Sequence, residues 1–335
     1  MALTVLAALA AVVAWRLRAG NFRWSAFAAS FRGVDWWWFA LCVLLNFGGY
    51  FVRAPRWEVM LRPVRAGVSV WNIFKATLIG FAALMLLGRP GELVRPYLIA
   101  TKERMPFSSQ MAAWFLERIF DLLMVLAIFS FALTQIPPEA VARHPILDRI
   151  LSTAGWLAGA LAIICFTLLF VLGRYPRQAR RRLTAALGVV PAALKPRVER
   201  LVSTFIEGMQ SVSSRGHLLM LAGYTLLEWV LIVSTTWSVL KAFPATAHFG
   251  LTGACIFLGF VAFGSMVQIP GIGGGPQVAG AMALSQILGV PVEPAAAVSL
   301  VFWFVSFVVV LPVGVGLALH EGLSWGKLSH LKDEI

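Results

Sequence analysis

The chain has 335 residues, of which 59% are hydrophobic and 13% are charged, and its formal net charge is +13. This composition excludes an ordinary soluble domain, in which about a quarter of the residues are charged. The excess of basic residues could suit nucleic acid, but these residues stand between apolar segments without interleaved aromatics, so we expect no nucleic-acid partner. Anionic lipid headgroups are the better match.

Apolar segments follow one another along the chain and predict an all-α, polytopic integral membrane protein formed by a single domain over residues 1–335. We expect about six full spans and two segments that are interrupted by glycine and proline. The segments are 2–15, 36–52, 71–87, 111–136, 151–172, 217–240, 249–269, 277–290 and 298–319. The first is short, but no small-residue cleavage site follows it, so we expect a retained anchor and not a signal peptide.

The first interruption, Gly88-Arg89-Pro90-Gly91, is followed by Glu92 and Arg95. Ionisable groups at membrane depth cost about 2.5 kcal/mol or more each, so they usually have a function. Proline suits the first turn of a helix, and a helix N-terminus offers free N–H groups to an anion. Arg89 and Arg95 could therefore bind a phosphate while Glu92 orients them. The alternative is a self-contained salt-bridge cluster that holds the break in shape.

Glu117 and Asp121 lie four residues apart in segment 111–136, hence on one face of a helix, and Arg118 can reach Asp121. The two carboxylates could receive a cationic headgroup, or bind and release a proton. Equally, they could neutralise neighbouring arginines in a fixed network. Glu228, a lone acid in segment 217–240, is a secondary candidate that could equally lie near an interface.

The longest polar stretch, 173–216, is rich in arginine, and the positive-inside rule predicts that it is cytoplasmic, with 136–150 on the opposite side. Apolar residues between 194 and 212 recur at helical spacing, which predicts an amphipathic helix at the membrane surface or on the protein itself. Arginines on both sides of segment 36–52 leave the orientation of the N-terminal spans open. They are Arg16, Arg18, Arg23 and Arg32 before it and Arg53, Arg56, Arg62 and Arg65 after it.

The second interruption contains Gly271, Gly273, Gly274 and Gly275, with Gln277 shortly after it. It lacks the Lys-Ser/Thr of a phosphate-binding P-loop, and no strand is expected before it. A helix break with close backbone approach and free amides is the better interpretation. Gln277 could hydrogen-bond a headgroup or cap exposed backbone.

The two interrupted segments resemble each other, with Ile79-Gly80-Phe81 in the first and Leu258-Gly259-Phe260 in the second. Matching broken helices in two halves of a chain point to a transporter-type site near the bilayer midplane. We therefore expect two re-entrant helical hairpins, related as inverted repeats, whose breaks face one polar cavity.

No nucleophile–base arrangement or metal-ligand spacing is present in the sequence. The three cysteines lie in apolar runs and suit neither a disulfide framework nor a metal site. The five histidines lie near the ends of apolar segments. We therefore expect no metal, no cofactor and no enzymatic activity.

At these residues the chain resembles the lysylphosphatidylglycerol synthase transmembrane-domain family, also called flippase-like. The family pattern Gly-Arg-x-Gly-Glu-x-x-Arg followed by Glu-Arg-x-x-Asp is present here as Gly88, Arg89, Gly91, Glu92, Arg95, Glu117, Arg118 and Asp121. The resemblance covers roughly residues 36–320 and includes the break at 270–275. Family members often place a glutamate soon after this break, where the chain has Pro276 and Gln277, and this disfavours a substrate as cationic as lysyl-phosphatidylglycerol.

The resemblance implies translocation of a lipid between leaflets of the cell membrane, the lipid being an aminoacylated phospholipid or a polyprenyl-phosphate-linked glycan. Because no soluble domain follows residue 320, we expect no aminoacyl transfer. Two other functions stay open: a membrane-embedded lipid-modifying enzyme or its accessory subunit, and a membrane scaffold whose charge cluster is structural. Membrane lipids are the expected partners, and assembly of several copies also stays open.

Overall fold

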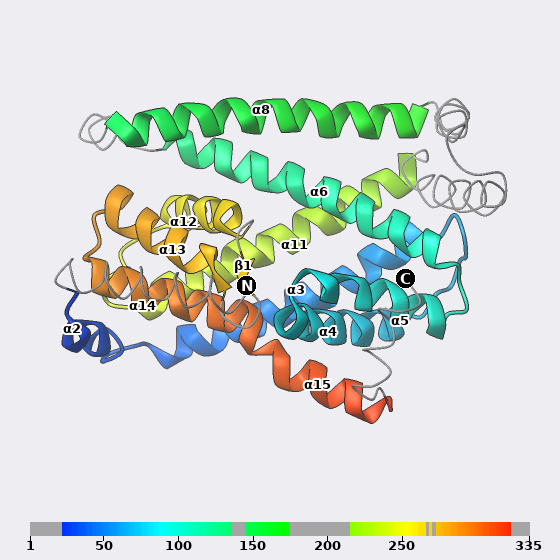
Figure 1. Ribbon diagram of the computed structural model, residues 1–335, viewed down its shortest axis with the longest axis horizontal. Helices are drawn as coiled ribbons and strands as arrows, with labels where there is room; N and C mark the ends of the chain where they lie inside the picture. Colours follow the sequence, from blue (N-terminus) through cyan, green and yellow to red (C-terminus); the bar gives the residue numbers. More distant parts are fainter. Residues whose placement is uncertain (1–21, 136–144, 175–214, 266–267, 270–272, 323–335) are drawn as a thin grey trace, which may run out of the picture.

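The computed structural model of the protein describes residues 22–135, 145–174, 215–265, 268–269 and 273–322, and in these ranges it is almost entirely helical (Figure 1). The all-α expectation is therefore confirmed. The expected anchor at 2–15, most of the basic loop 173–216 with its amphipathic helix, and Gly271 lie outside the described residues.

Four described helical segments are long and apolar enough to cross a membrane, judged by length and composition: Trp36–Leu61, Val70–Leu87, Arg215–Ala242 and Val292–His320. Shorter apolar stretches cover Gly155–Phe170 and Leu251–Gly264. Helix α6 (Phe107–Thr134) is equally long but carries three charged residues in its middle. The number of six full spans stays a prediction.

Helices α3 (Trp36–Leu61) and α11 (Arg215–Ala242) pack against each other in opposite directions. The Asp35 N–H donates to the Ala242 carbonyl at 2.9 Å, and Arg62 Nη1 lies 3.5 Å from Met220 Sδ, so contacts join the pair at both ends. The side chain of Asp35 caps α3 by accepting from the Trp37 N–H at 2.9 Å. The short helix α2 (Trp24–Ala29) precedes this pair.

The expected span 36–52 is too short, because α3 continues through Pro55 to Leu61. Arg53 and Arg56 therefore lie inside a helix and do not flank it, which corrects the sequence-based interpretation. Arg56 has no exposed surface. Only Arg62 and Arg65 remain as basic residues directly after this helix.

The first helical hairpin consists of α4 (Val70–Leu87), a 3-10 turn η1 (Arg89–Leu93) and α5 (Val94–Lys102). Gly88 ends α4 with a φ of 71°, a conformation that favours glycine. The two arms touch closely at glycines: a Cβ at Gly91 would lie 2.4 Å from the carbonyl of Ala83, and one at Gly80 would lie 2.7 Å from the Cβ of Arg95. The expected break after segment 71–87 is confirmed.

The second helical hairpin consists of α12 (Leu251–Gly264), α13 (Gly275–Met282) and a π-helical turn η4 (Ala283–Ile287). Between its arms the two-residue strands β1 (Gln268–Ile269) and β2 (Gly273–Gly274) pair in antiparallel fashion. Its arms also meet at a glycine, because a Cβ at Gly264 would lie 2.5 Å from the carbonyl oxygen of Gly275. The second break is confirmed at its described residues.

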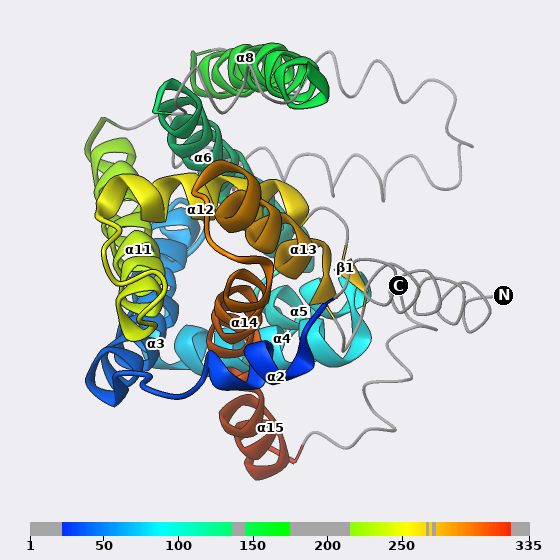
Figure 2. The same cartoon turned by 90° about the vertical axis from the view of Figure 1, so that its left-hand side faces the viewer.

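The two hairpins lie toward opposite ends of the molecule, with α4 and α5 to the right in Figure 1, α12 and α13 to the left, and β1 between them. Helix α6 passes beside both, and α8 (Pro145–Arg174) lies outermost against α6 (Figure 2). Two chain segments far apart in sequence therefore bring their non-helical backbone to the middle of the bundle.

The last helical segment runs from α14 (Val292–Trp303) through a π-helical turn η5 (Phe304–Val308) to α15 (Val310–His320). A π-turn leaves carbonyls without their usual helical partner, and side chains of α3 take their place. Asn46 Nδ2 donates to the Val305 carbonyl at 2.8 Å, and the Tyr50 hydroxyl donates to the Ser306 carbonyl at 2.6 Å. These bonds fix α3 to the last segment beside the cavity described next.

Candidate functional site

A cavity of about 360 Å³ is lined by residues of both hairpins and of α3, α6, α11 and η5. This volume lies in the range of small-molecule sites. Residues close to the first break line it (Leu84, Glu92), as do residues close to the second (Ser265, Pro276). The expectation that the two breaks share one polar cavity is met by these lining residues, whereas their depth in a bilayer stays a prediction.

The lining of the cavity is divided between charged and apolar residues. The ionisable lining residues are Arg53, Glu92, Arg95, Arg118 and Asp121, together with Tyr50. The apolar lining includes Leu45, Val125, Ile232, Leu258, Phe302 and Phe307. Such a division suits an amphiphile with a charged head and a hydrocarbon tail.

Arg95 and Glu117 form a two-pronged ion pair in the protein interior. Arg95 Nη1 donates to Glu117 Oε1 at 3.1 Å, and Nη2 donates to Oε2. The guanidinium carbon of Arg95 lies 3.9 Å from the centre of the Trp57 ring, and Trp57 in turn donates to Gln110 Oε1 at 3.0 Å. This fork geometry with ring stacking fixes both side chains, so Glu117 is held by protein contacts and is not open to a ligand.

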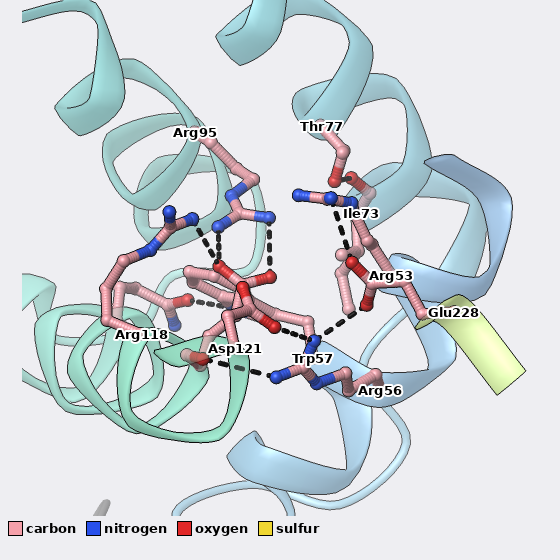
Figure 3. Close-up of polar contacts among 11 residues, drawn as sticks. Arg53, Arg56, Trp57, Ile73, Thr77, Arg95, Arg118, Asp121 and Glu228 are labelled. Atoms are coloured by element: carbon pink, nitrogen blue, oxygen red, sulfur yellow. Dashed lines mark hydrogen bonds and ion pairs between the residues drawn. The ribbon is translucent and has the colours of Figure 1, made fainter. Parts of the chain in front are cut away.

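Arg56 joins α3 to two other helices from a fully buried position (Figure 3). Its Nη1 donates to Asp121 Oδ1 of α6 and to Glu228 Oε2 of α11, both at 2.7 Å, and its Nη2 donates to the Glu117 carbonyl at 3.2 Å. Glu228, named as a secondary candidate from the sequence, is thus buried in the network and lies away from any helix end.

Arg53 lies one turn before Arg56 and approaches the same glutamate, with its Nη2 2.9 Å from Glu228 Oε1. Its guanidinium lies 4.8 Å from the centre of the Phe81 ring and 5.8 Å from that of Tyr50. Its side chain keeps 16% of its surface accessible and lines the cavity. Arg53 therefore has protein contacts on one side and the cavity on the other.

Arg118 is the most accessible cation of the cavity. Its side chain is 42% accessible, compared with 5% for Arg95. Its Nη2 lies 3.2 Å from Glu117 Oε2, its guanidinium lies 5.9 Å from the Trp114 ring, and Glu92 is near enough to attract it electrostatically. A guanidinium has five N–H donors, and Arg118 lines the cavity while its Nη2 donates to Glu117 Oε2.

The charges of this cluster balance, with four arginines (Arg53, Arg56, Arg95 and Arg118) facing four carboxylates (Glu92, Glu117, Asp121 and Glu228). The sequence did not reveal which acids meet which arginines. Arg89, expected to bind a phosphate together with Arg95, is exposed and does not line the cavity. The site thus includes Glu92, Arg95, Glu117, Arg118, Asp121 and Glu228, whereas Arg89 is not among the residues that line the cavity.

The glycines of the second break shape backbone. Gly274 has a φ of 98°, Gly273 and Gly274 form β2, and Gly275 begins α13. Gln277 Oε1 accepts from the Gly274 N–H at 2.7 Å, so its side chain caps the start of α13. Of the two functions expected for Gln277, this contact favours the capping one.

A family model described as the lysylphosphatidylglycerol synthase TM region matches residues 2–314. The chain belongs to this family. Comparisons with curated proteins and with solved structures found no match. The family match includes both hairpins and every ionisable residue that lines the cavity, and it confirms the resemblance drawn from the two charged motifs.

In this family member, sequence reasoning missed Arg53 and Arg56 as site residues. A signal was present, because apolar residues continue after them to Leu61 at helical spacing. Two arginines three residues apart inside a continuing apolar helix lie on one face and mark a buried polar site better than a helix end.

Proposed function

We propose that the protein moves a phosphate-bearing lipid between the two leaflets, acting as a flippase or scramblase. The observation that carries the proposal is Arg118, a charged and accessible side chain in a cavity that both helix breaks border. A guanidinium binds a phosphate with two parallel N–H donors and a planar fork, which makes it the preferred side chain for such a group.

The accessibility of each arginine side chain suggests its role in the cavity. Arg118 and Arg53 are accessible from the cavity and would bind the phosphate, whereas Arg56 and Arg95 are buried and hold the helices together. Glu92 lines the cavity near Arg118 and would orient it. The apolar lining would accommodate the first part of the lipid chain.

The two helical hairpins favour a protein that transports its lipid over one that only binds it. Each is a pair of packed helices joined by a break, and the two pairs lie toward opposite ends of the bundle (Figure 1). We propose that they are re-entrant and related as inverted repeats, so that movement of either would open the cavity to one side, as in transporters with broken helices. We favour transport over catalysis for this site.

Basic residues at one end of the helical bundle support a proposal for its orientation in the membrane. Arg62 lies beside Met220 of α11, and Lys102 pairs with Glu321. Arg65 donates to the Glu103 carbonyl and connects these two contacts, so the ends of α3, α5 and α15 and the start of α11 lie together. Arg65, Arg104 and Arg215 belong to this same basic end. We propose that it faces the cytoplasm, together with loop 173–216, and that the protein resides in the cell membrane.

The proposal is tested with purified protein in liposomes that contain a fluorescent phospholipid, by measuring how fast the label becomes inaccessible to an external quencher. Wild-type protein should exchange the lipid between leaflets, and Arg118→Gln should reduce the rate at least tenfold while leaving thermal stability nearly unchanged. Arg62→Gln, which removes an arginine outside the cavity, is the matched control and should exchange normally. Exchange by Arg118→Gln at the wild-type rate would refute the assignment.

A further inference from the structure

Three side-chain polar atoms of α11 are buried without a hydrogen-bond partner among the described residues. One of them, Glu228 Oε1, lies 2.9 Å from the guanidinium of Arg53. The other two are the indole N–H of Trp229 and the hydroxyl of Thr235. Both residues line the cavity, and they are 7% and 3% exposed. Most buried polar groups in proteins are paired, because an unpaired one loses its bonds to water without replacement. Two such groups on one wall of one cavity require an explanation.

The neighbouring hydroxyls of the same helix show that α11 can satisfy such groups. Thr225, Thr236 and Ser238 are equally buried, and each donates to the carbonyl four residues earlier, at 2.7 to 2.8 Å. None of these three lines the cavity. Thr235, whose hydroxyl lacks this bond, is the one of these four residues that lines the cavity.

The carboxylates of the site are each engaged with an arginine. Glu117 faces Arg95, Asp121 faces Arg56, and Glu228 faces both Arg53 and Arg56. Glu92 lies near Arg118. A cationic headgroup would therefore have to displace an arginine from its acid and would meet Arg53 and Arg118 as like charges.

We propose that the cavity selects a lipid whose phosphate carries an uncharged, hydroxylated group, and that Trp229 and Thr235 bind the hydroxyls of that group. The indole N–H donates to a hydroxyl oxygen, while the Thr235 hydroxyl donates or accepts. Arg118 and Arg53 bind the phosphate. This inference rests on the proposed lipid transport and adds the substrate class, which a glycerol headgroup and a sugar headgroup both satisfy.

The test uses wild-type protein in liposomes with four tail-labelled probes: phosphatidylglycerol, a polyprenyl-phosphate-linked sugar, phosphatidic acid and lysyl-phosphatidylglycerol. At least one of the two probes whose phosphate carries an uncharged, hydroxylated group, phosphatidylglycerol or the polyprenyl-phosphate-linked sugar, should exchange roughly fivefold or more faster than phosphatidic acid and lysyl-phosphatidylglycerol. Which of the two is faster identifies the source of the hydroxyls. Faster exchange of lysyl-phosphatidylglycerol would overturn the proposal.

Two variants test whether residues of α11 determine the headgroup preference. Thr235→Val should slow the preferred probe roughly two- to tenfold, the effect of one lost hydrogen bond, and leave phosphatidic acid exchange unchanged. Trp229→Phe should act in the same direction. Thr236→Val is the matched control, because its hydroxyl is bonded within the helix, and it should keep the wild-type preference.

Stability provides a second readout. The melting temperature of Thr235→Val should equal or exceed that of the wild type, since a buried hydroxyl without a partner is removed, whereas Thr236→Val should melt lower. A lower melting temperature for Thr235→Val would mean that the hydroxyl has a structural partner and would refute the proposal. Absence of exchange for every probe would contradict the proposed transport itself, whereas exchange without headgroup preference would contradict only this inference.

Discussion

Arg56 shows how a charge can be stable in the interior of this bundle. Its guanidinium has no exposed surface and contacts Asp121, Glu228 and the Glu117 carbonyl. Burying an ion costs several kcal/mol, and this cost is offset only where partners of opposite charge meet it with good geometry. The arrangement therefore depends on all partners being present.

We expect Arg56→Gln to lower the free energy of unfolding by about 3–5 kcal/mol, because Asp121 loses its arginine and Glu228 keeps only Arg53. Arg62→Gln breaks an accessible i,i+4 pair with Glu58 and should cost about 0.5 kcal/mol or less. Thermal unfolding of both variants in detergent measures the difference. Similar losses would mean that the buried network does not hold α3, α6 and α11 together.

Glu117 provides a second test of whether a buried charge stabilises the fold or binds a ligand. From the sequence, Glu117 could have received a cationic headgroup or a proton in a hydrated cavity. In the structure its surface is only 1% exposed, and its carboxylate accepts a hydrogen bond from Arg95. We expect Glu117→Gln to destabilise the protein by about 3–5 kcal/mol. The double variant Glu117→Gln/Arg95→Met should lose clearly less than the sum of the two single losses, as measured by a thermal double-mutant cycle. Additive losses would show that the two side chains are energetically independent.

Much of the site could be predicted from the sequence because its residues lie close along the chain. Arg95, Glu117, Arg118 and Asp121 were named from their motifs, and all four belong to the cluster. Their pairing could not be predicted, since Arg56 meets Asp121 and Glu228 at sequence separations of 65 and 172 residues. Only tertiary packing decides which acid meets which arginine, and for the same reason the sequence did not show that Arg118 lines the cavity and Arg89 does not.

The helical hairpins depend on glycines that allow one arm to touch the backbone of the other. A Cβ at Gly91 would lie 2.4 Å from the Ala83 carbonyl, which is fixed by its helix. We expect Gly91→Ala to cost about 1–3 kcal/mol of stability through overpacking. The control is Gly223→Ala, a helical position with open space, where alanine should be neutral or stabilising by up to about 1 kcal/mol. Thermal unfolding distinguishes the two, and equal effects would refute close packing of the first hairpin.

The sequence located these elements well, because apolar runs and glycine–proline breaks are local signals. The break after Leu87 is at Gly88, where a positive φ requires glycine. The π-helical turn at Phe304–Val308 has no such local signal, since it is stabilised by Asn46 and Tyr50 of a distant helix. The end of α3 was misplaced because two buried arginines look like the polar flank of a span.

Taken together, the bundle places two hairpins toward opposite ends and one cavity between them, with Gly49 of α3 in its wall. A Cβ at Gly49 would meet no atom within 4 Å, so a side chain can be introduced there without distortion. Gly223 has the same open space but is exposed on the outside of α11. The two positions form a matched pair, one inside the cavity and one outside.

The most direct test of the account is to block this cavity covalently. Cys42, Cys165 and Cys255 would be replaced by alanine, and Gly49→Cys or Gly223→Cys introduced into that background and reconstituted in liposomes. After reaction with a bulky thiol reagent, lipid exchange should stop for Gly49→Cys and continue for Gly223→Cys. If fully modified Gly49→Cys protein exchanges lipid as fast as the unmodified protein, the cavity is not the path of the lipid.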